Sequence, residues 1–223
     1  AEQGIFNFPY IWHFNTYIAS ILKLFLAIVI VSMMANEYSY GTLKQNLIDG
    51  MSKKEFLLSK VYTILVFSLV STTLVFVISL ILGLKYSSFT EIGIIFSDLE
   101  YLFAYFLKHV AFFSFCLFLA LLIKRSAFTL GFIFIWFLGE NIGHAILKYE
   151  ILGYTHLDKD TTSIDFLKKM FPLESMSNLI VEPFSRLNFV KSVTTTVGAT
   201  IEKNYAVEPI SIAIVVFWTC LFL

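Results

Sequence analysis

The chain has 223 residues, of which 58% are hydrophobic and 14% are charged, and its mean hydropathy is +0.80. Soluble domains are about half apolar and a quarter charged, so this composition excludes an ordinary soluble domain and indicates an all-helical protein that crosses a membrane several times. The formal net charge is zero, which gives no electrostatic argument for nucleic acid as a partner. The two cysteines form neither a disulfide framework nor a metal motif.

The first predicted elements are an aromatic segment and a membrane helix. Aromatic side chains crowd residues 6–17, just before an apolar run, which is typical of the membrane–water interface. The run itself, Tyr17–Ala35, is close to the about 20 residues that cross a bilayer, so we expect one helix there. A second run, Val61–Leu84, is also long enough to cross. Its hydroxyl residues suit either close helix contact or bonds back to their own helix: Ser68, Ser71, Thr72, Thr73 and Ser79.

A polar element, residues 36–60, lies between these two runs. Four lysines mark it as cytoplasmic: Lys44, Lys53, Lys54 and Lys60. Ser52 and Glu55 form an S-x-x-E capping box, so we expect the next helix to begin near Lys53. Gly50 suits the left-handed position that ends a preceding helix.

That preceding helix is predicted over about residues 40–49 and is too short to span. It carries one apolar face, formed by Leu43, Leu47 and Ile48, and we expect it to lie along the cytoplasmic surface. By themselves these residues favour a plain connector over a functional element, because capping boxes are common local devices.

The remaining elements follow in chain order. They are a loop over Lys85–Glu100, a helix over Tyr101–Ile123, a basic turn at Lys124–Arg125, a helix over Ala127–Leu147, a mixed segment over Lys148–Glu208 and a helix from Pro209. With 36–60 inside, the basic turn is inside too, and the acidic loop is outside, in agreement with the positive-inside rule. The mixed segment then lies outside, with an amphipathic stretch over Ser163–Leu179 that Pro172 interrupts.

The two ends of the chain read as cut. The chain does not begin with Met, and its last apolar run, 209–223, reaches about 22 Å at ~1.5 Å per residue, short of the roughly 30 Å apolar core. We therefore expect a fragment with five membrane helices. Residues 1–147 hold four of them and the 36–60 element, residues 148–208 form an extracytoplasmic segment, and 209–223 begin the last helix.

Four short motifs occur in order through the 36–60 element. They are Asn36-Glu37, Gly41-Thr42-Leu43, Gly50-Met51-Ser52-Lys53 and Glu55-Phe56-Leu57-Leu58-Ser59-Lys60. With the helix before them, these motifs resemble the type-2 permease family of ABC transporters, the membrane subunits of ATP-driven exporters. Members of that family have six membrane helices, and the five predicted here are similar to the second to sixth. The extracytoplasmic segment is longer than in compact members, which leaves its role open.

The resemblance implies that the 36–60 element is a coupling helix that docks on an ATPase subunit. The implied docking residues are Glu37, Tyr40, Gly41, Thr42, Leu43, Lys44, Leu47, Ile48 and Gly50, and Ser52 and Glu55 cap the following helix. It further implies a homo- or heterodimer of permeases in the cell (inner) membrane, with ATP and Mg²⁺ on the separate ATPase. The chain contains no P-loop motif, so we expect no cofactor and no ATPase site of its own.

Ionisable residues inside the predicted spans are functional candidates by default. They are Lys23, Lys108, His109 and Glu140, with His144 one turn beyond. At ~1.5 Å per residue they lie about 20–24 Å from the inner boundary, in one layer of the outer third of the membrane. The favoured interpretation is that the lysines extend to the outer surface and Glu140 lies in a satisfied network. The sharper hypothesis is a lysine–glutamate pair that closes a translocation path.

Two other classes of function compete with the permease. An intramembrane enzyme could use Glu140 and His144, which share a helix face at i, i+4 spacing, although a metal site needs at least three ligands. A secondary transporter is disfavoured because internal repeats and broken helices are not evident. No feature of the sequence selects a transported substrate.

Overall fold

The computed structural model describes residues 5–89, 91–152, 166–186 and 204–223, and for 147–152 only the backbone. The described part is helical and contains no strand. Its helices are α1 (Tyr10–Ile21), α2 (Lys23–Ser39), α3 (Thr42–Ile48), α4 (Lys53–Tyr86), α5 (Ile92–Ile95), α6 (Glu100–Ile123), α7 (Ser126–Leu152), α9 (Pro172–Asn178) and α11 (Pro209–Phe222), with a 3-10 turn at Phe184–Arg186.

Three of these helical stretches are long and apolar enough to cross a membrane: α4, α5 continued by α6, and α7. The pair α1 and α2 forms a fourth if it is counted as one bent span, and α11 is a shorter apolar helix. The chain is therefore a helical membrane protein with three or four candidate spans in its described part.

The first span differs from its prediction. In place of one helix over 17–35, the structure has α1 and α2, bent by 45° at Leu22. The aromatic segment predicted at the membrane interface is largely α1, and Phe8, Trp12 and Phe14 are buried against protein. Trp12 stacks on Phe76 of α4 with ring centroids 5.5 Å apart. Its indole N–H also donates to the backbone carbonyl of Ile95, at 2.7 Å.

Helix α6 forms the centre of the fold. It is apolar on all sides, as expected of a helix enclosed by others, and it packs against α1, α2, α4, α7, α9 and α11. In its most apolar stretch 72% of the residues are buried, against 22% in α4 and 17% in α7. Helices α4 and α7 therefore present wide apolar faces to their surroundings.

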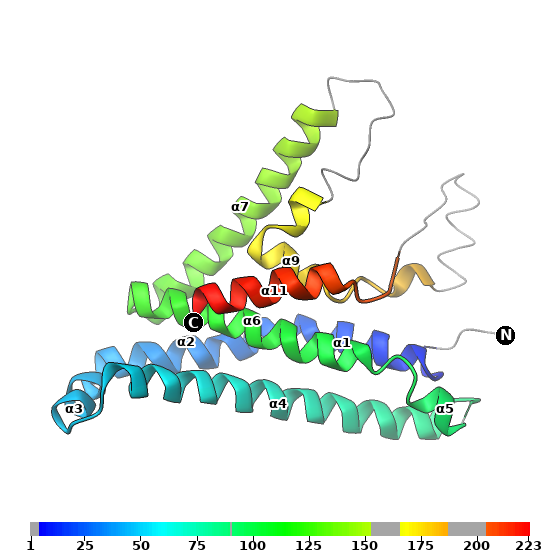
Figure 1. Cartoon of the computed structure of the whole chain (residues 1–223), viewed down its shortest axis with the longest axis horizontal. Coiled ribbons are helices and arrows are strands. Elements are labelled where there is room, and N and C mark those ends of the chain that lie inside the picture. Colours follow the sequence, from blue (N-terminus) through cyan, green and yellow to red (C-terminus); the bar gives the residue numbers. More distant parts are fainter. Residues whose placement is uncertain (1–4, 90, 153–165, 187–203) are drawn as a thin grey trace.

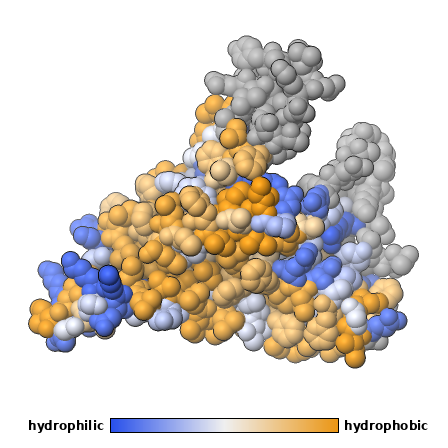
Figure 2. Space-filling view, in the orientation of Figure 1, coloured by the Kyte–Doolittle hydropathy of each residue, from blue (hydrophilic) through white to orange (hydrophobic). Residues whose placement is uncertain are grey.

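The arrangement of these helices defines two ends (Figure 1). Helices α1, α2, α4, α6 and α11 run alongside one another, whereas α7 rises away from them. The short helix α3 lies at one end and α5 at the other. Figure 2 shows an apolar band over the middle of this face, with hydrophilic residues gathered around α3 and at the opposite end.

The other predicted elements lie close to their expected positions. Helix α6 ends at Lys124, which adopts a left-handed conformation with φ 62° and turns the chain directly into α7. Helix α9 begins at Pro172, where the amphipathic stretch was expected to break. Residues 153–165 and 187–203 of the predicted extracytoplasmic segment lie outside the described part of the chain.

Candidate functional site

The 36–60 element is held together by the carboxylate of Glu37. This side chain, near the end of α2, accepts a hydrogen bond from the hydroxyl of Thr42 at the start of α3. It also forms an ion pair with the ammonium of Lys60 on α4, at 2.5 Å. Both charged side chains are largely shielded, with 18% and 12% of their surface exposed. One carboxylate thus joins α2, α3 and α4.

Two cation–π contacts lie at the same end of the molecule. The Lys60 ammonium lies 4.9 Å from the ring centroid of Phe56, and the Lys124 ammonium lies 5.5 Å from that of Tyr38. The second contact brings the turn between α6 and α7 to the same end of the molecule as α3. The two basic turns that the sequence places on one side therefore do lie at one end.

Backbone geometry accounts for the two glycines of the element. Gly41 precedes α3 with φ +71°, and Gly50 follows it with φ +101°, a region that side chains with a Cβ rarely adopt. The predicted capping box is present: Glu55 N–H donates to Ser52 Oγ at 3.2 Å, and Ser52 N–H donates to a Glu55 carboxylate oxygen at 2.8 Å. Helix α4 consequently begins at Lys53, as the sequence predicts.

The predicted apolar face of α3 is split between two environments. Leu43 packs against the core of the protein and Leu47 is half-buried, whereas Ile48 is 83% exposed. Tyr40, just before α3, is 78% exposed, and Lys44 is exposed on the helix. The three apolar side chains therefore do not form one continuous exposed face, because Leu43 packs against the core and Ile48 does not. The exposed side chains in and beside α3 include Tyr40, Lys44 and Ile48.

The ionisable residues within the spans do not form one cluster. The Lys108 ammonium lies 3.3 Å from Ser20 Oγ, and Lys23 lies over the ring of Phe112, 4.8 Å from its centroid. Lys108 is only 3% exposed and Lys23 is half-buried, so the expectation that both reach the outer surface is wrong for Lys108. Helix α6 instead places the Lys108 side chain against Ser20 of α1.

His109 follows Lys108 on α6, and its side chain is buried in the core. Its Nδ1 is 2.9 Å from the carbonyl oxygen of Tyr105, and its ring packs on those of Tyr105 and Phe113. Its Nε2 is buried, with no hydrogen-bond partner among the described residues.

Glu140 is satisfied by α7 itself and by α9. Its carboxylate accepts from the indole N–H of Trp136 at 2.7 Å and from the backbone N–H groups of Leu173 and Glu174 at 3.2 and 3.0 Å. Among the described residues no lysine pairs with it, so the structure does not bring together the lysine–glutamate pair of the gate hypothesis. The carboxylate instead binds the open N–H groups that begin α9, where a negative charge is favourable.

His144 lies one turn further along α7, and its ring packs edge-on against Phe171 with centroids 4.9 Å apart. Within the described residues no three His, Cys, Asp or Glu side chains are grouped as a metal site would need. Glu140 and His144 therefore both contact the segment that leads into α9.

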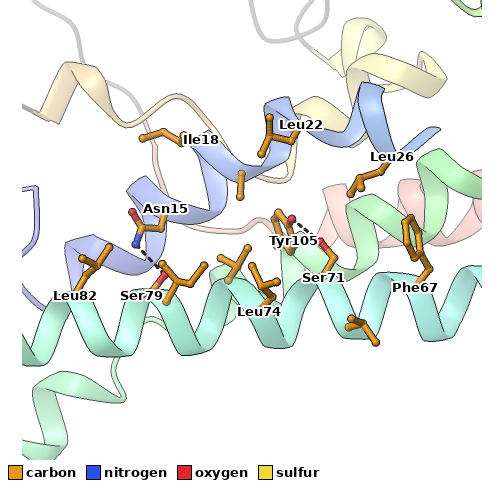
Figure 3. Close-up of a pocket in the computed structure, with 14 residues that line it drawn as sticks. Asn15, Ile18, Leu22, Leu26, Phe67, Ser71, Leu74, Ser79, Leu82 and Tyr105 are labelled. Atoms are coloured by element: carbon orange, nitrogen blue, oxygen red, sulfur yellow. Dashed lines mark hydrogen bonds between the residues drawn. The ribbon is translucent and has the colours of Figure 1, made fainter. Parts of the chain in front are cut away.

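The sequence gives little sign of a groove between α1 and α4 (Figure 3). This groove has a volume of about 470 Å³ and is lined by residues of α1, α2, α4 and α6, including Leu22 at the bend. Its walls are apolar except for two hydrogen-bonded pairs, Asn15 with Ser79 and Ser71 with Tyr105, each at 2.9 Å. The two serines lie among the hydroxyls of α4 that suit helix contact, but their partners are distant in sequence.

The hydroxyls of α4 divide between the two expected roles. Thr72 and Thr73 donate back to the carbonyl oxygens of Ser68 and Leu69 in their own helix. Ser71 and Ser79 contact neighbouring helices. Both interpretations drawn from the sequence therefore hold, at different positions.

A second network that the sequence does not reveal lies at the other end of α1. His13 stacks on Tyr101 of α6 with centroids 4.3 Å apart, and its Nε2 is 2.7 Å from the carbonyl oxygen of Val181. Tyr101 donates to the carbonyl of Tyr205, whose ring lies 4.2 Å from the guanidinium of Arg186. These contacts fasten the segments around 181–186 and 205 to the bundle.

Comparison with known proteins identifies one family. A family model described as Protein of unknown function (DUF2705) matches residues 6–179, a stretch that includes the 36–60 element, Lys23, Lys108 and Glu140. No curated protein and no solved structure matches the chain. Because the matched stretch covers well over half of its length, the chain belongs to the DUF2705 family.

Proposed function

We propose that the chain is the membrane-spanning permease subunit of an ABC exporter, driven by ATP that a separate subunit hydrolyses. The observation that carries the proposal is the construction of the 36–60 element. Helix α3 is short, is joined to α2 and α4 through Glu37, and exposes Ile48, while Tyr40 is exposed just before it. Exposed apolar side chains on a braced helix are what a docking partner needs.

The contacts that hold α3 in place would also transmit the movement of a docked partner to the neighbouring helices. A force on α3 would reach both α2 and α4 through Glu37, which bonds Thr42 at the start of α3 and Lys60 on α4. Helix α4 then continues without interruption for 34 residues, so its two ends move together. Docking on α3 could in this way couple a motor at one end of the molecule to a rearrangement at the other.

The proposed topology places α3 in the cytoplasm of a cell with the chain in its inner membrane. Lysines and arginine at the α3 end support this orientation, since cytoplasmic turns are enriched in these residues. We further propose that α11 belongs to a fifth span, with the bent α1–α2 pair counted as the first. The wide apolar faces of α4 and α7 would be covered by lipid and by a second permease subunit.

The intramembrane-enzyme alternative receives no comparable support. The Glu140 oxygens accept hydrogen bonds from an indole and from two backbone N–H groups, which is a satisfactory structural role for a buried carboxylate. A general acid or base would need one of these bonds to be replaced by substrate.

Co-purification tests the proposal directly. The tagged chain, extracted from native membranes, should retain a P-loop ATPase encoded by a neighbouring gene, and Ile48→Asp combined with Tyr40→Asp should lower that retention about tenfold or more. Both side chains are exposed, so the fold should survive their replacement.

The matched control is Ile92→Asp, which changes an equally exposed isoleucine, 75% accessible, on the short helix α5 at the opposite end. It should leave retention unchanged. Failure of the unchanged chain to retain any P-loop ATPase, or equal retention by both variants, would contradict the docking assignment.

A further inference from the structure

Two lysines, the buried Lys108 and the half-buried Lys23, share a pocket on the side of α1 that faces α9. The pocket has a volume of about 350 Å³ and is lined by residues of the α1–α2 bend, α6 and the end of α9, among them Ser20, Lys23, Lys108 and Asn178. Lys108 is 3% exposed, and the hydrogen bond that it forms is to Ser20 Oγ, at 3.3 Å. A neutral hydroxyl oxygen is a weak partner for a buried ammonium ion.

Neither lysine forms an ion pair with a carboxylate in the described part of the chain. The ion pairs found there are Glu37 with Lys60 and Lys169 with Glu208. Glu182 also lines the pocket and accepts hydrogen bonds from the Phe184 N–H and the Ser185 hydroxyl, so one carboxylate stands against two ammonium groups and the lining keeps an excess of one positive charge.

A buried ammonium ion is costly when its partner is a neutral oxygen, and a second positive charge nearby adds repulsion. Lys108 is 3% exposed, and the half-buried Lys23 lines the same pocket. An anionic group from outside the chain would offset this excess of positive charge.

We infer that this pocket binds the anionic group, a phosphate or a carboxylate, of a membrane amphiphile. Two ammonium groups supply the charge, and the Asn178 amide lines the pocket as a neutral donor beside them. Lys108 lies about 24 Å along α6 from Lys124, at ~1.5 Å per residue. With Lys124 at the cytoplasmic end, this depth corresponds to the outer region of the bilayer, close to the head groups of the outer leaflet.

The inference goes beyond the proposed permease function; its choice of leaflet rests on the proposed topology, but anion binding itself can be measured on the chain alone. The purified chain would be placed in nanodiscs of phosphatidylcholine, or of phosphatidylcholine with an equal amount of phosphatidylglycerol. Lipid that remains bound after detergent extraction would then be counted by native mass spectrometry. We expect the retained lipid to favour phosphatidylglycerol about tenfold.

The test variant is Lys23→Met combined with Lys108→Met, which removes both charges and should abolish the preference. The matched control, Lys85→Met, removes an exposed lysine at the end of α4 away from the pocket and should preserve it. Lys23→Arg, which keeps the charge, should also preserve it. Circular dichroism checks that each variant keeps its helices.

A second experiment distinguishes a lipid head group from a soluble anion as the ligand of the pocket. Inorganic phosphate is titrated into the chain in phosphatidylcholine nanodiscs, and thermal melting is followed. A rise in melting temperature that the double methionine variant lacks supports a pocket that also takes soluble anions, whereas no rise with retained lipid preference assigns it to lipid head groups.

Equal retention of both lipids by the unchanged chain, without any phosphate effect, would overturn the inference. A phosphatidylglycerol preference that survives in the double methionine variant would overturn it as well. Neither result bears on whether an ATPase binds α3, so failure of this inference and failure of the permease proposal are distinguishable.

Discussion

Glu37 shows how one side chain can hold a helix junction in place. Its partners, Thr42 and Lys60, lie 5 and 23 residues further along the chain, so the carboxylate closes the loop between α2 and α4 as well as the turn into α3. Because both charged groups are partly shielded from water, their attraction should exceed that of an exposed surface pair.

A charge exchange tests this junction. Glu37→Lys and Lys60→Glu, made separately, should each lower the free energy of unfolding by about 1–2 kcal/mol, since each places like charges together and removes a charged hydrogen bond. The double exchange should recover a large part of this loss. It should not recover all of it, because a lysine at 37 cannot accept from the Thr42 hydroxyl.

Thermal and denaturant unfolding in detergent measures these changes. Lys54→Glu provides the control, because Lys54 is an exposed lysine on the first turn of the same helix, and its change should stay within about 0.5 kcal/mol. A double exchange no more stable than either single variant would show that the pair does not hold the junction.

At the scale of elements, α9 depends on a carboxylate from another helix. Glu140 on α7 accepts from the Leu173 and Glu174 N–H groups, and the first N–H groups of a helix have no partner within it. A helix of seven residues is too short to be stable alone, so this contact and its buried side chains must position it.

Removing the Glu140 carboxylate should therefore loosen α9. Glu140→Ala should lower the protection of the Leu173 and Glu174 amides from hydrogen exchange by about 10- to 100-fold, which corresponds to the about 1.5–3 kcal/mol of a charged hydrogen bond. Glu140→Gln should have a smaller effect, because the amide keeps one acceptor oxygen.

Asn141→Ala is the matched control for this measurement. Asn141 is the next residue of α7, and its side chain bonds only within the helix, to the carbonyl of Phe137. Its replacement should leave the α9 amides unchanged. If Glu140→Ala also leaves them unchanged, the carboxylate does not anchor α9.

The elements that could be predicted are those set by neighbours in sequence. The capping box at Ser52, the glycine at 50 and the proline at 172 act over three or four residues, and the helices begin or end at these signals. Hydrophobic runs likewise indicate α4, α6 and α7, because length alone decides whether a helix can span.

The features that could not be predicted depend on partners distant in sequence. The bend at Leu22 accompanies the packing of Trp12 on α4 and α5, and Glu140 meets N–H groups 33 and 34 residues away. The sequence places Glu140 and the lysines at similar distances from the inner boundary. It does not show which way each side chain faces around its helix, and in the structure the Glu140 carboxylate faces α9. Periodicity contains no information about which neighbour covers a face.

At the scale of the whole molecule, α6 is the interior and the other helices surround it. The apolar faces of α4 and α7 remain open to lipid or to another subunit, while α3 presents its exposed side chains at one end. This asymmetry, with a braced helix at one end and Lys23 and Lys108 toward the other, is the basis for assigning docking and ligand binding to different regions.

Site-specific photo-crosslinking from position 48 in native membranes tests the central claim most directly. A photoreactive amino acid replaces Ile48 in one variant and Ile92 in another, and the adducts are identified by mass spectrometry. Docking on α3 predicts a P-loop ATPase in the adduct from position 48 and none from position 92. Absence of a P-loop ATPase from the position 48 adduct, or the same adduct from both positions, would contradict the account.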